Sequence, residues 1–287
     1  MPTSPERDEY NSLADPALPG GYPANHFAFQ QMLNVLAEEG ARTVLEVGMG
    51  GGKAIPLLAG AGHELAGLEI DDANVAACRT KMAEFGQDPD AVVWGDISDA
   101  ASYVSLRKRA PFDALIAMGV LPHVHQERAT LENMRALVRP GGLIFVECRN
   151  SLFSLVTFNR YTYEFFMDEL FAETQGGLRD ELDAFLRARL AVDVPPPPTG
   201  HAPRYHNPLA VPTLFADAGF TDILIRPFHY HATPPMIERT DPGAFRIQSI
   251  ALENEPSDWR GLLLCSAYVV QARRPQSGSM TASSSEA

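Results

Sequence analysis

Short apolar runs alternate with segments of helical spacing over residues 43–150. The runs are rich in branched side chains and are bounded by Gly, Pro or Asp, as buried β-strands usually are. Between the second and third runs, apolar residues recur at helical intervals, which predicts a helix at Asp72–Phe85. Near-continuous apolar strands separated by helices indicate an α/β fold, with a parallel sheet covered by helices on both faces. The predicted strands are Thr43–Val47, Glu64–Ile70, Ala91–Trp94, Phe112–Ala117 and Leu143–Glu147.

The pattern changes after Asn150. Residues 151–190 have helical spacing and a crowd of aromatic side chains, and the run Pro195–Pro198 ends this segment because proline cannot continue a helix. A loop and a short helix are expected between the last two predicted strands. The remaining predicted elements are a helix at Pro208–Ala218 and strands at Thr221–His231 and Leu262–Ala272.

Acidic residues outnumber basic ones, with 36 Asp and Glu against 23 Lys and Arg and a formal net charge of −13. A protein that binds nucleic acid needs a basic face to neutralise phosphates. The charge balance therefore argues against a nucleic-acid partner.

The three cysteines, Cys78, Cys148 and Cys265, are far apart and form no CxxC pair. This spacing predicts buried, reduced thiols, with neither a disulfide framework nor a zinc site. No apolar run approaches the roughly 20 residues of a membrane span, and the first ten residues lack the basic-then-apolar layout of a secretory signal. These features predict a cytoplasmic protein without a membrane partner.

A glycine-rich turn follows the first predicted strand in LEVGMGGGK, Leu45–Lys53. Gly48, Gly50 and Gly52 permit positive φ angles and, lacking Cβ, let the backbone come close to a ligand. The start of the helix that follows offers unpaired N–H groups to an electron-rich ligand group. The turn predicts a ligand site, and a plain tight strand-to-helix connection is the alternative.

Glu69 ends the second predicted strand, 17 residues beyond Gly52. A carboxylate at this place can accept hydrogen bonds from both hydroxyls of a ribose, and it also marks NAD-binding sheets. The dinucleotide pattern G-x-G-x-x-G, counted from Gly48, requires glycine where Lys53 stands. The spacing that begins at Glu46 is instead E-x-G-x-G-x-G, and a nicotinamide-dependent oxidoreductase is kept as an alternative.

With these motifs, residues 41–150 resemble the class I, Rossmann-like S-adenosylmethionine-dependent methyltransferases. FDALIAMGVLPHV (Phe112–Val124) and LVRPGGLIFVE (Leu137–Glu147) resemble the motifs of the fourth and fifth strands of that superfamily. The resemblance implies an enzyme that uses S-adenosylmethionine and releases S-adenosylhomocysteine. It implies that the glycine loop contacts the methionine part, Glu69 the ribose, Asp96 the adenine amino group and Ile97 the adenine ring. The residues placed at the cofactor are Glu46, Gly48, Met49, Gly50, Gly52, Glu69, Asp96, Ile97 and Met118.

The resemblance also implies a seven-stranded, mostly parallel sheet with helices on both faces, an antiparallel last strand and a helical insertion that caps the substrate side. The expected parts of the chain are a flexible arm at residues 1–20, the cofactor-binding core at 21–150, the cap insertion at 151–205, the completion of the core sheet with substrate-side loops at 206–274, and a disordered tail at 275–287.

His123 follows the fourth predicted strand, near where the active site of the resembled family opens. A general base assists methylation of a hydroxyl, so His123 is the first candidate for that role. Many relatives carry His or Glu directly before this histidine, whereas Pro122 stands here. Capping or packing of the next helix is the alternative role for His123.

His229 and His231 stand two apart on a predicted strand, so both rings are expected on the same face. Together with Tyr205 and His206 they are candidates for binding substrate hydroxyls. A metal site and structural hydrogen bonding are the alternatives. No carboxylate stands at a spacing typical of metal ligands, so no metal is expected.

An Asn/Asp-Pro-Pro-aromatic motif, which is typical of methylation of a base amino group, is absent after the fourth predicted strand. The expected acceptor is therefore a small molecule, methylated on a hydroxyl of a sugar, a glycan or a natural product. N- or carboxyl-methylation of a small metabolite and a non-catalytic cofactor-binding partner protein are alternatives. The oligomeric state stays open, with a homodimer as one option.

Overall fold

The computed structural model describes residues 13–17, 20, 22–193 and 203–276. Most of the expected N-terminal arm, the run Pro195–Pro198 and nearly all of the expected tail lie outside the described residues. The chain divides into two compact units. Unit 1 comprises Met1–Met32, Glu147–Val211 and Ile225–Val269, and unit 2 comprises Leu33–Val146, Pro212–Leu224 and Val270–Ala287.

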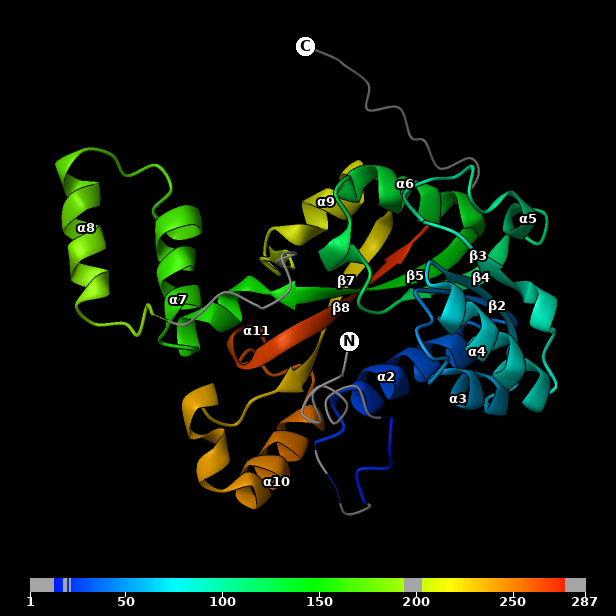
Figure 1. Ribbon diagram of the computed structural model, residues 1–287, viewed down its shortest axis with the longest axis horizontal. Coiled ribbons are helices and arrows are strands. Elements are labelled where there is room, and N and C mark those ends of the chain that lie inside the picture. Colours follow the sequence, from blue (N-terminus) through cyan, green and yellow to red (C-terminus); the bar gives the residue numbers. More distant parts are fainter. Residues whose placement is uncertain (1–12, 18–19, 21, 194–202, 277–287) are drawn as a thin grey trace, which may run out of the picture. The chain divides into compact units, whose positions relative to one another are not determined.

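One eight-stranded sheet runs through the described part of the chain in the order β3-β2-β1-β4-β5-β8-β7, with the short β6 paired to β5 (Figure 1). Strands β1 to β5 are parallel where they pair. Gly141 and Gly142, near the start of β5, exchange backbone hydrogen bonds with Arg274, just beyond the end of β8, so β8 is antiparallel to β5. The strands are β1 Thr43–Val47, β2 Glu64–Glu69, β3 Val92–Trp94, β4 Phe112–Ala117, β5 Val138–Asn150, β6 Tyr205–His206, β7 Thr221–Tyr230 and β8 Cys265–Arg273.

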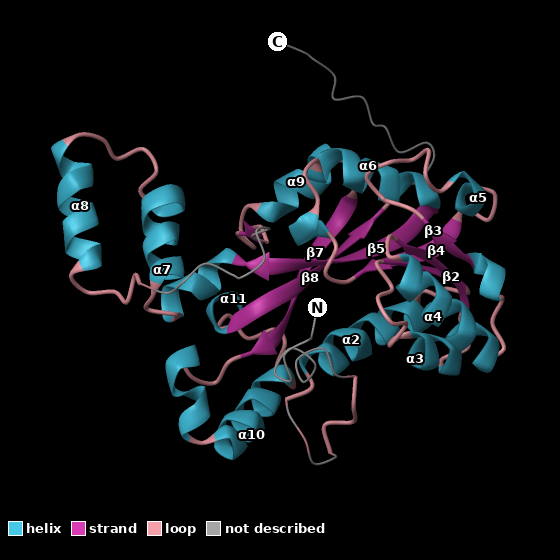
Figure 2. Ribbon diagram, viewed as in Figure 1, coloured by secondary structure: helices cyan, strands magenta, loops and turns pink. Residues whose placement is uncertain are grey.

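Helices cover both faces of the sheet in unit 2, with α3 and α4 on one side and α5 and α6 on the other (Figure 2). The core between these layers is apolar, and Val44, Leu115 and Ile144 of three adjacent strands are fully buried. The helices are α2 Ala24–Glu38, α3 Ile55–Gly60, α4 Asp72–Glu84, α5 Val104–Arg107, α6 Glu127–Leu137, α7 Arg160–Glu164, α8 Gly177–Arg187, α9 Val211–Asp217, α10 Pro242–Glu253 and α11 Gly261–Leu264. Shorter helical turns are η1 Pro89–Ala91, η2 Leu121–His123, η3 Ser151–Val156, η4 Phe165–Leu170 and η5 Pro235–Thr240.

The α/β architecture predicted from the sequence is confirmed. β1 and β4 have the predicted bounds, and β2 and β3 are each one residue shorter than predicted. β8 begins later than predicted, because Gly261–Leu264 forms a helical turn instead of extended chain. The sheet also has one strand more than the seven expected, since Tyr205 and His206 pair with the end of β5.

Residues 151–190 are largely helical, as the sequence predicted, but the chain forms three separate helical stretches there, namely η3, α7 continuing directly into η4, and α8. Polar side chains separate these stretches by bonding to the local backbone. Thr157 Oγ1 donates to Ser154 O at 2.9 Å, and Asn159 Oδ1 accepts from Tyr161 N at 2.9 Å, which caps a new helix. Gly176, with φ of +61°, precedes the last piece.

Two helices were missed or underestimated. The sequence patterns predict no helix before Thr43, yet α2 spans 15 residues. Helix α10 has 12 residues where a short helix was expected. Its start has a recognisable signal, because Asp241 Oδ1 accepts from Ala244 N at 2.9 Å and Pro242 occupies the first turn.

Asp113, at the start of β4, joins three neighbouring strands of unit 2. Its Oδ2 accepts from the backbone N–H groups of Arg42 and Thr43, both at 2.9 Å, and its Oδ1 accepts from Arg139 Nε at 2.6 Å. Burial raises the pKa of Asp113, but these hydrogen bonds outweigh burial and hold the pKa at about 2.

We expect Asp113→Asn to lower the free energy of unfolding at pH 7 by about 1–3 kcal/mol, because a charged acceptor of several donors is lost. The carboxyl has a lower pKa in the folded chain than the ordinary value of 3.8. Its contribution is therefore present above about pH 4 and is lost as the pH falls toward 2. Urea unfolding at pH 7 and pH 3 should show the difference between wild type and variant shrinking at the lower pH. Asp90→Asn, at an exposed position, is the control, and a difference independent of pH would contradict the assignment.

Candidate functional site

The glycine loop after β1 has a backbone that only glycine adopts easily. Gly48 has φ of +74° and donates its N–H to Leu68 O at 2.8 Å. A Cβ at Gly48 would meet Val120 Cγ2 at 2.5 Å, so no larger residue fits without a shift. Gly52 has φ of +67°, and a Cβ there would meet Ile55 Cδ1 at 2.7 Å. Glycine is therefore required at both positions for the loop to close around the end of the sheet.

Glu69 holds this loop from the neighbouring strand. Its Oε2 accepts from Gly50 N at 2.7 Å, and its Oε1 accepts from the N–H groups of Ile70 and Asp71 at 2.9 and 3.0 Å. The side chain is buried. Oε1 already accepts two donors, whereas Oε2 accepts one and has a lone pair left, so Glu69 can still accept a further donor such as a ribose hydroxyl. The loop and the acidic residue predicted from the sequence thus lie together.

Glu46 lies at the same end of the sheet as a second buried acid. Burial, with a further contribution from the negative charge of Glu69, raises the pKa of Glu46 to about 8. Its Oε2 is buried and has no hydrogen-bond partner among the described residues. Such an oxygen favours a cationic ligand group, so Glu46 and Glu69 fit a positively charged nucleoside such as S-adenosylmethionine.

Cys78 and Lys81 of α4 also contact the loop. Cys78 Sγ donates to Gly50 O at 3.1 Å, and Lys81 Nζ donates to Gly51 O at 3.1 Å. Burial, together with the charges of Glu46 and Glu69, raises the pKa of the Cys78 thiol to about 11. All three cysteines are free and buried, as the sequence predicted.

The other predicted cofactor residues lie on the loops that follow β1, β3 and β4. Asp96 Oδ1 accepts from Ser98 N at 2.8 Å, and Ile97 is buried directly after it. Met118 follows β4 and is half-buried. Met49 is buried against β2, because a Cβ at Gly67 would lie 1.9 Å from its Sδ. The position of Met49 therefore indicates packing of the loop onto the sheet.

His123 ends the turn η2 and is exposed. Its backbone N–H donates to Val120 O at 3.0 Å, and the residue precedes helix α6 by only a few positions. His123 therefore lies between β4 and α6, where the sequence analysis had placed it. His125, two residues on, is exposed as well.

The histidines near the end of β7 form a buried aromatic cluster in unit 1. The His229 and His231 ring centroids are 4.8 Å apart, as expected for one face of a strand, although His229 has φ of +61°. Phe153 lies 4.5 Å from the His231 ring. Burial lowers the pKa of His229 well below its ordinary value, and the charges of His231 and Arg149 lower it further.

Tyr205 and His206 lie on β6, which pairs with Arg149 and Asn150 at the end of β5. The Tyr205 ring is 5.9 Å from the ring of Tyr161, and its side chain is partly exposed. These contacts lie within unit 1. No group of three or more His, Cys, Asp or Glu is arranged to hold a metal ion in the part of the chain that the structure describes.

Sequence reasoning missed two acids of this cluster. Glu238 accepts a hydrogen bond from His231 Nδ1, and Glu253 accepts one from Tyr22 Oη and one, at 3.1 Å, from Tyr230 N. Burial raises the pKa of Glu253 to about 7, although these hydrogen bonds act to lower it. Glu238 lies in η5 and Glu253 in α10. No sequence pattern relates these two elements to β7, so the sequence gives no indication that the two acids belong to the cluster.

A profile of a known family, described as a methyltransferase domain, matches residues 24–225, which is more than half of the chain. The chain belongs to this methyltransferase family. Its resemblance to the S-adenosylmethionine-dependent methyltransferases is thereby confirmed, together with the enzyme class and the cofactor. The nicotinamide-dependent alternative loses its support.

Two curated relatives of this methyltransferase bear the name ubiquinone biosynthesis O-methyltransferase. The protein from Paraburkholderia phytofirmans is 31% identical over 109 residues, covering 38% of this chain and 45% of the relative. The protein from an Azoarcus species is 25% identical over 166 residues, covering 55% and 69%. The chain therefore spans about half the length of the first of these relatives.

A solved S-adenosylmethionine-dependent methyltransferase from Mesorhizobium loti has a TM-score of 0.50 at 12% identity, covering 86% of this chain and 98% of that one. At this identity the likeness shows the fold alone. Among the described helices, none is long and apolar enough to cross a membrane.

We expect Glu46→Gln to stabilise the methyltransferase at alkaline pH. The unfolded chain releases the Glu46 proton near the ordinary pKa of 4.5, whereas the folded chain holds it up to about 8. Folded stability therefore falls as the pH rises through this range, and removal of the carboxyl should abolish that fall. Urea unfolding should show a gain of about 1–3 kcal/mol at pH 8.5 and almost none at pH 5. The exposed Glu64→Gln on β2 is the control, and an unchanged pH profile would overturn the buried-acid assignment.

Proposed function

We propose that this methyltransferase transfers the methyl group of S-adenosylmethionine to a hydroxyl of a small molecule, such as a sugar, a glycan or a natural product. The observation that carries the proposal is the pair of buried acids at the glycine loop. Glu69 Oε2 accepts a hydrogen bond from Gly50 N at 2.7 Å, while Oε2 of Glu46 has no hydrogen-bond partner among the described residues. This arrangement suits a ligand that carries both ribose hydroxyls and positive charge.

The chain's own residues have defined roles under this proposal. Glu69 accepts the ribose hydroxyls, Glu46 faces the positive charge of the methionine part, and Asp96 accepts from the adenine amino group beside Ile97. The cofactor supplies a methyl group on a sulfonium, whose leaving group is already good. The protein then mainly contributes position and exclusion of water.

Transfer to a hydroxyl also needs an acceptor for its proton. His123 is proposed as this base because it stands after β4 at the family's active-site position. His206, His229, His231 and Tyr205 are proposed to bind the acceptor. The name of the curated relatives supports O-methylation, and the net charge of −13 supports a small molecule over a nucleic acid.

Glu69→Gln should weaken binding of S-adenosylmethionine by about 10–100-fold, because hydrogen bonds to a charged acceptor are lost. Isothermal titration calorimetry with S-adenosylmethionine and S-adenosylhomocysteine measures the effect. Glu64→Gln, at the exposed start of the same strand, should bind like wild type. Unchanged affinity in Glu69→Gln would remove the ribose assignment, and wild-type binding of NAD but not S-adenosylmethionine would remove the proposed function.

His123→Ala should lower kcat at least about 100-fold, as expected for a general base, and change cofactor affinity less than about twofold. The measurement is transfer from labelled S-adenosylmethionine to the best acceptor found in a screen of small alcohols, phenols and sugars. His125→Ala, also exposed and two residues away, is the matched control. Equal rates in both variants would exclude His123 as the base.

A further inference from the structure

Trp94, the last residue of β3, donates a side-chain hydrogen bond to the chain that carries Glu69. Its indole Nε1–H donates to Ile70 O at 2.8 Å, just beyond the end of β2. The backbone N–H of the following residue, Gly95, donates to Glu69 O at 3.0 Å. The end of β3 therefore fixes two successive carbonyl groups, those of Glu69 and Ile70.

The hydrogen bond of Trp94 is connected to the Glu69 carboxylate through a single peptide unit. The Ile70 carbonyl and the Asp71 N–H belong to the same trans peptide bond, which is planar, so the two groups point in opposite directions. The carbonyl accepts from Trp94, and the N–H donates to Glu69 Oε1 at 3.0 Å. Holding one end of this peptide therefore fixes the direction of the donor at its other end.

The same contacts continue to the glycine loop within unit 2. Glu69 Oε1 accepts from the N–H groups of Ile70 and Asp71, and Oε2 accepts from Gly50 N at 2.7 Å. A carboxylate is planar, so fixing Oε1 also fixes the direction of Oε2. Hydrogen bonds that follow one another in this way strengthen each other. A continuous series of contacts thus joins the Trp94 indole, one peptide, the Glu69 carboxylate and the loop.

Core packing does not account for the place of Trp94. β3 lies at one edge of the sheet, and Trp94 and Ile70 are 46% and 59% exposed. A tryptophan ring stabilises a fold mainly by the apolar area that it buries, and its N–H binds an acceptor as a second contribution. At this exposed edge the hydrogen bond to Ile70 O is the specific contact that the side chain makes.

We infer that Trp94 is a positioning residue for the cofactor, which acts through the Ile70–Asp71 peptide on the carboxylate of Glu69. The inference rests on the proposed role of Glu69 at the ribose and deepens it, because it names the side chain that keeps the acid in its binding orientation. Oε2 of Glu69 has one lone pair left for a hydroxyl donor, and the plane of the carboxylate sets the direction of that lone pair. Loss of the indole N–H frees the peptide, and with it the carboxylate.

The test measures the affinity of the full chain for S-adenosylmethionine by isothermal titration calorimetry. Trp94→Phe keeps an aromatic ring without the N–H and should weaken binding about 3–10-fold, the effect of one hydrogen bond. Benzothienylalanine in place of Trp94 has both rings and carries sulfur where the N–H was, so it should give the same loss. Trp259→Phe, at the other tryptophan of the chain and 70% exposed, is the matched control and should bind like wild type.

A double-mutant cycle separates positioning from a general structural defect. Glu69→Gln lacks the carboxylate that Trp94 orients, so adding Trp94→Phe to it should weaken binding by less than about twofold. A second measurement needs no cofactor. Hydrogen exchange of the Asp71 amide in the free protein should be several-fold faster in Trp94→Phe than in wild type or Trp259→Phe.

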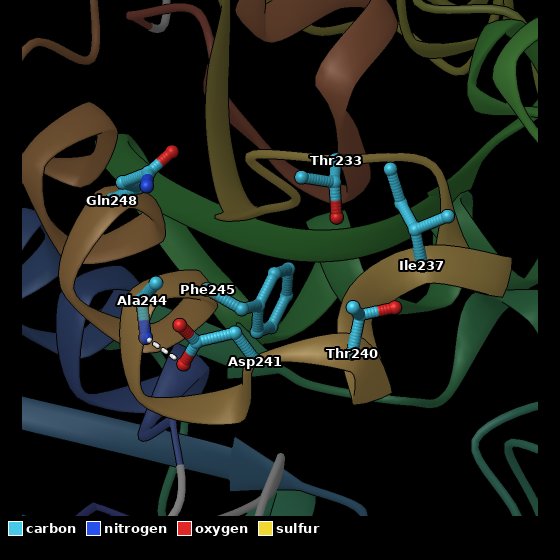
Figure 3. Close-up of a pocket in the computed structure, with 7 residues that line it drawn as sticks. All are labelled: Thr233, Ile237, Thr240, Asp241, Ala244, Phe245 and Gln248. Carbon is cyan, nitrogen blue, oxygen red and sulfur yellow. Dashed lines mark hydrogen bonds between the residues drawn. The ribbon is translucent and has the colours of Figure 1, made fainter.

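A pocket of about 340 Å³ between η5 and α10 in unit 1 provides a further control (Figure 3). Its volume lies within the range of small-molecule sites, so the place where the nucleoside binds can be checked there. Ala244 lines this pocket, and Ala244→Leu fills part of it. We expect this variant to bind S-adenosylmethionine like wild type.

Wild-type affinity in Trp94→Phe, together with weakened binding in Glu69→Gln, would overturn the inference and leave the proposed function intact. An equal loss from Trp94→Phe with and without Glu69→Gln would also overturn it, because Trp94 would then act independently of the acid. Unchanged affinity in Glu69→Gln, or a loss in Ala244→Leu, would remove the ribose assignment as well. Failure to find a hydroxyl acceptor would count against the proposed function alone, since none of these measurements uses turnover.

Discussion

The carboxylate of Glu69 holds the glycine loop in place from the neighbouring strand. It accepts three backbone N–H groups, from Gly50 in the loop and from Ile70 and Asp71 beyond β2. Ordering a loop with positive φ at Gly48 and Gly52 loses much backbone entropy. Hydrogen bonds to a fixed, charged acceptor offset this loss. The cofactor loop therefore depends on the strand next to it as much as on its own glycines.

Carboxyl groups behave differently at the two ends of this sheet. Asp113, at the amino end of β4, is surrounded by donors and has a pKa of about 2. Glu46, near the carboxyl end of β1, is buried and lies near the charge of Glu69, and burial followed by that charge raises its pKa to about 8. The number of nearby donors and charges, and not burial alone, decides which acid is ionised. One acid thus stabilises the sheet, while the other is left poised for a cationic ligand.

The sequence predicted the parts of the molecule whose signals are local. β1 and β4 were predicted with their bounds because buried parallel strands are continuous apolar runs, and Glu69 drew attention because it ends such a run. The helical character of residues 151–190 was predicted, but its interruptions were not, because they depend on local hydrogen bonds of the Thr157 and Asn159 side chains with the backbone. Glu238 and Glu253 were missed for a different reason, since only the fold brings them to the end of β7, beside His231 and Tyr230.

The alkylation rate of Cys78 offers a way to measure movement of the glycine loop. Its sulfur is buried in contact with Gly50 O, and its high pKa keeps it as the unreactive thiol. An alkylating reagent should attack this sulfur faster in molecules whose glycine loop has moved away from α4. The rate of labelling therefore reports how often the loop opens, and a bound nucleoside that holds the loop closed would lower this rate.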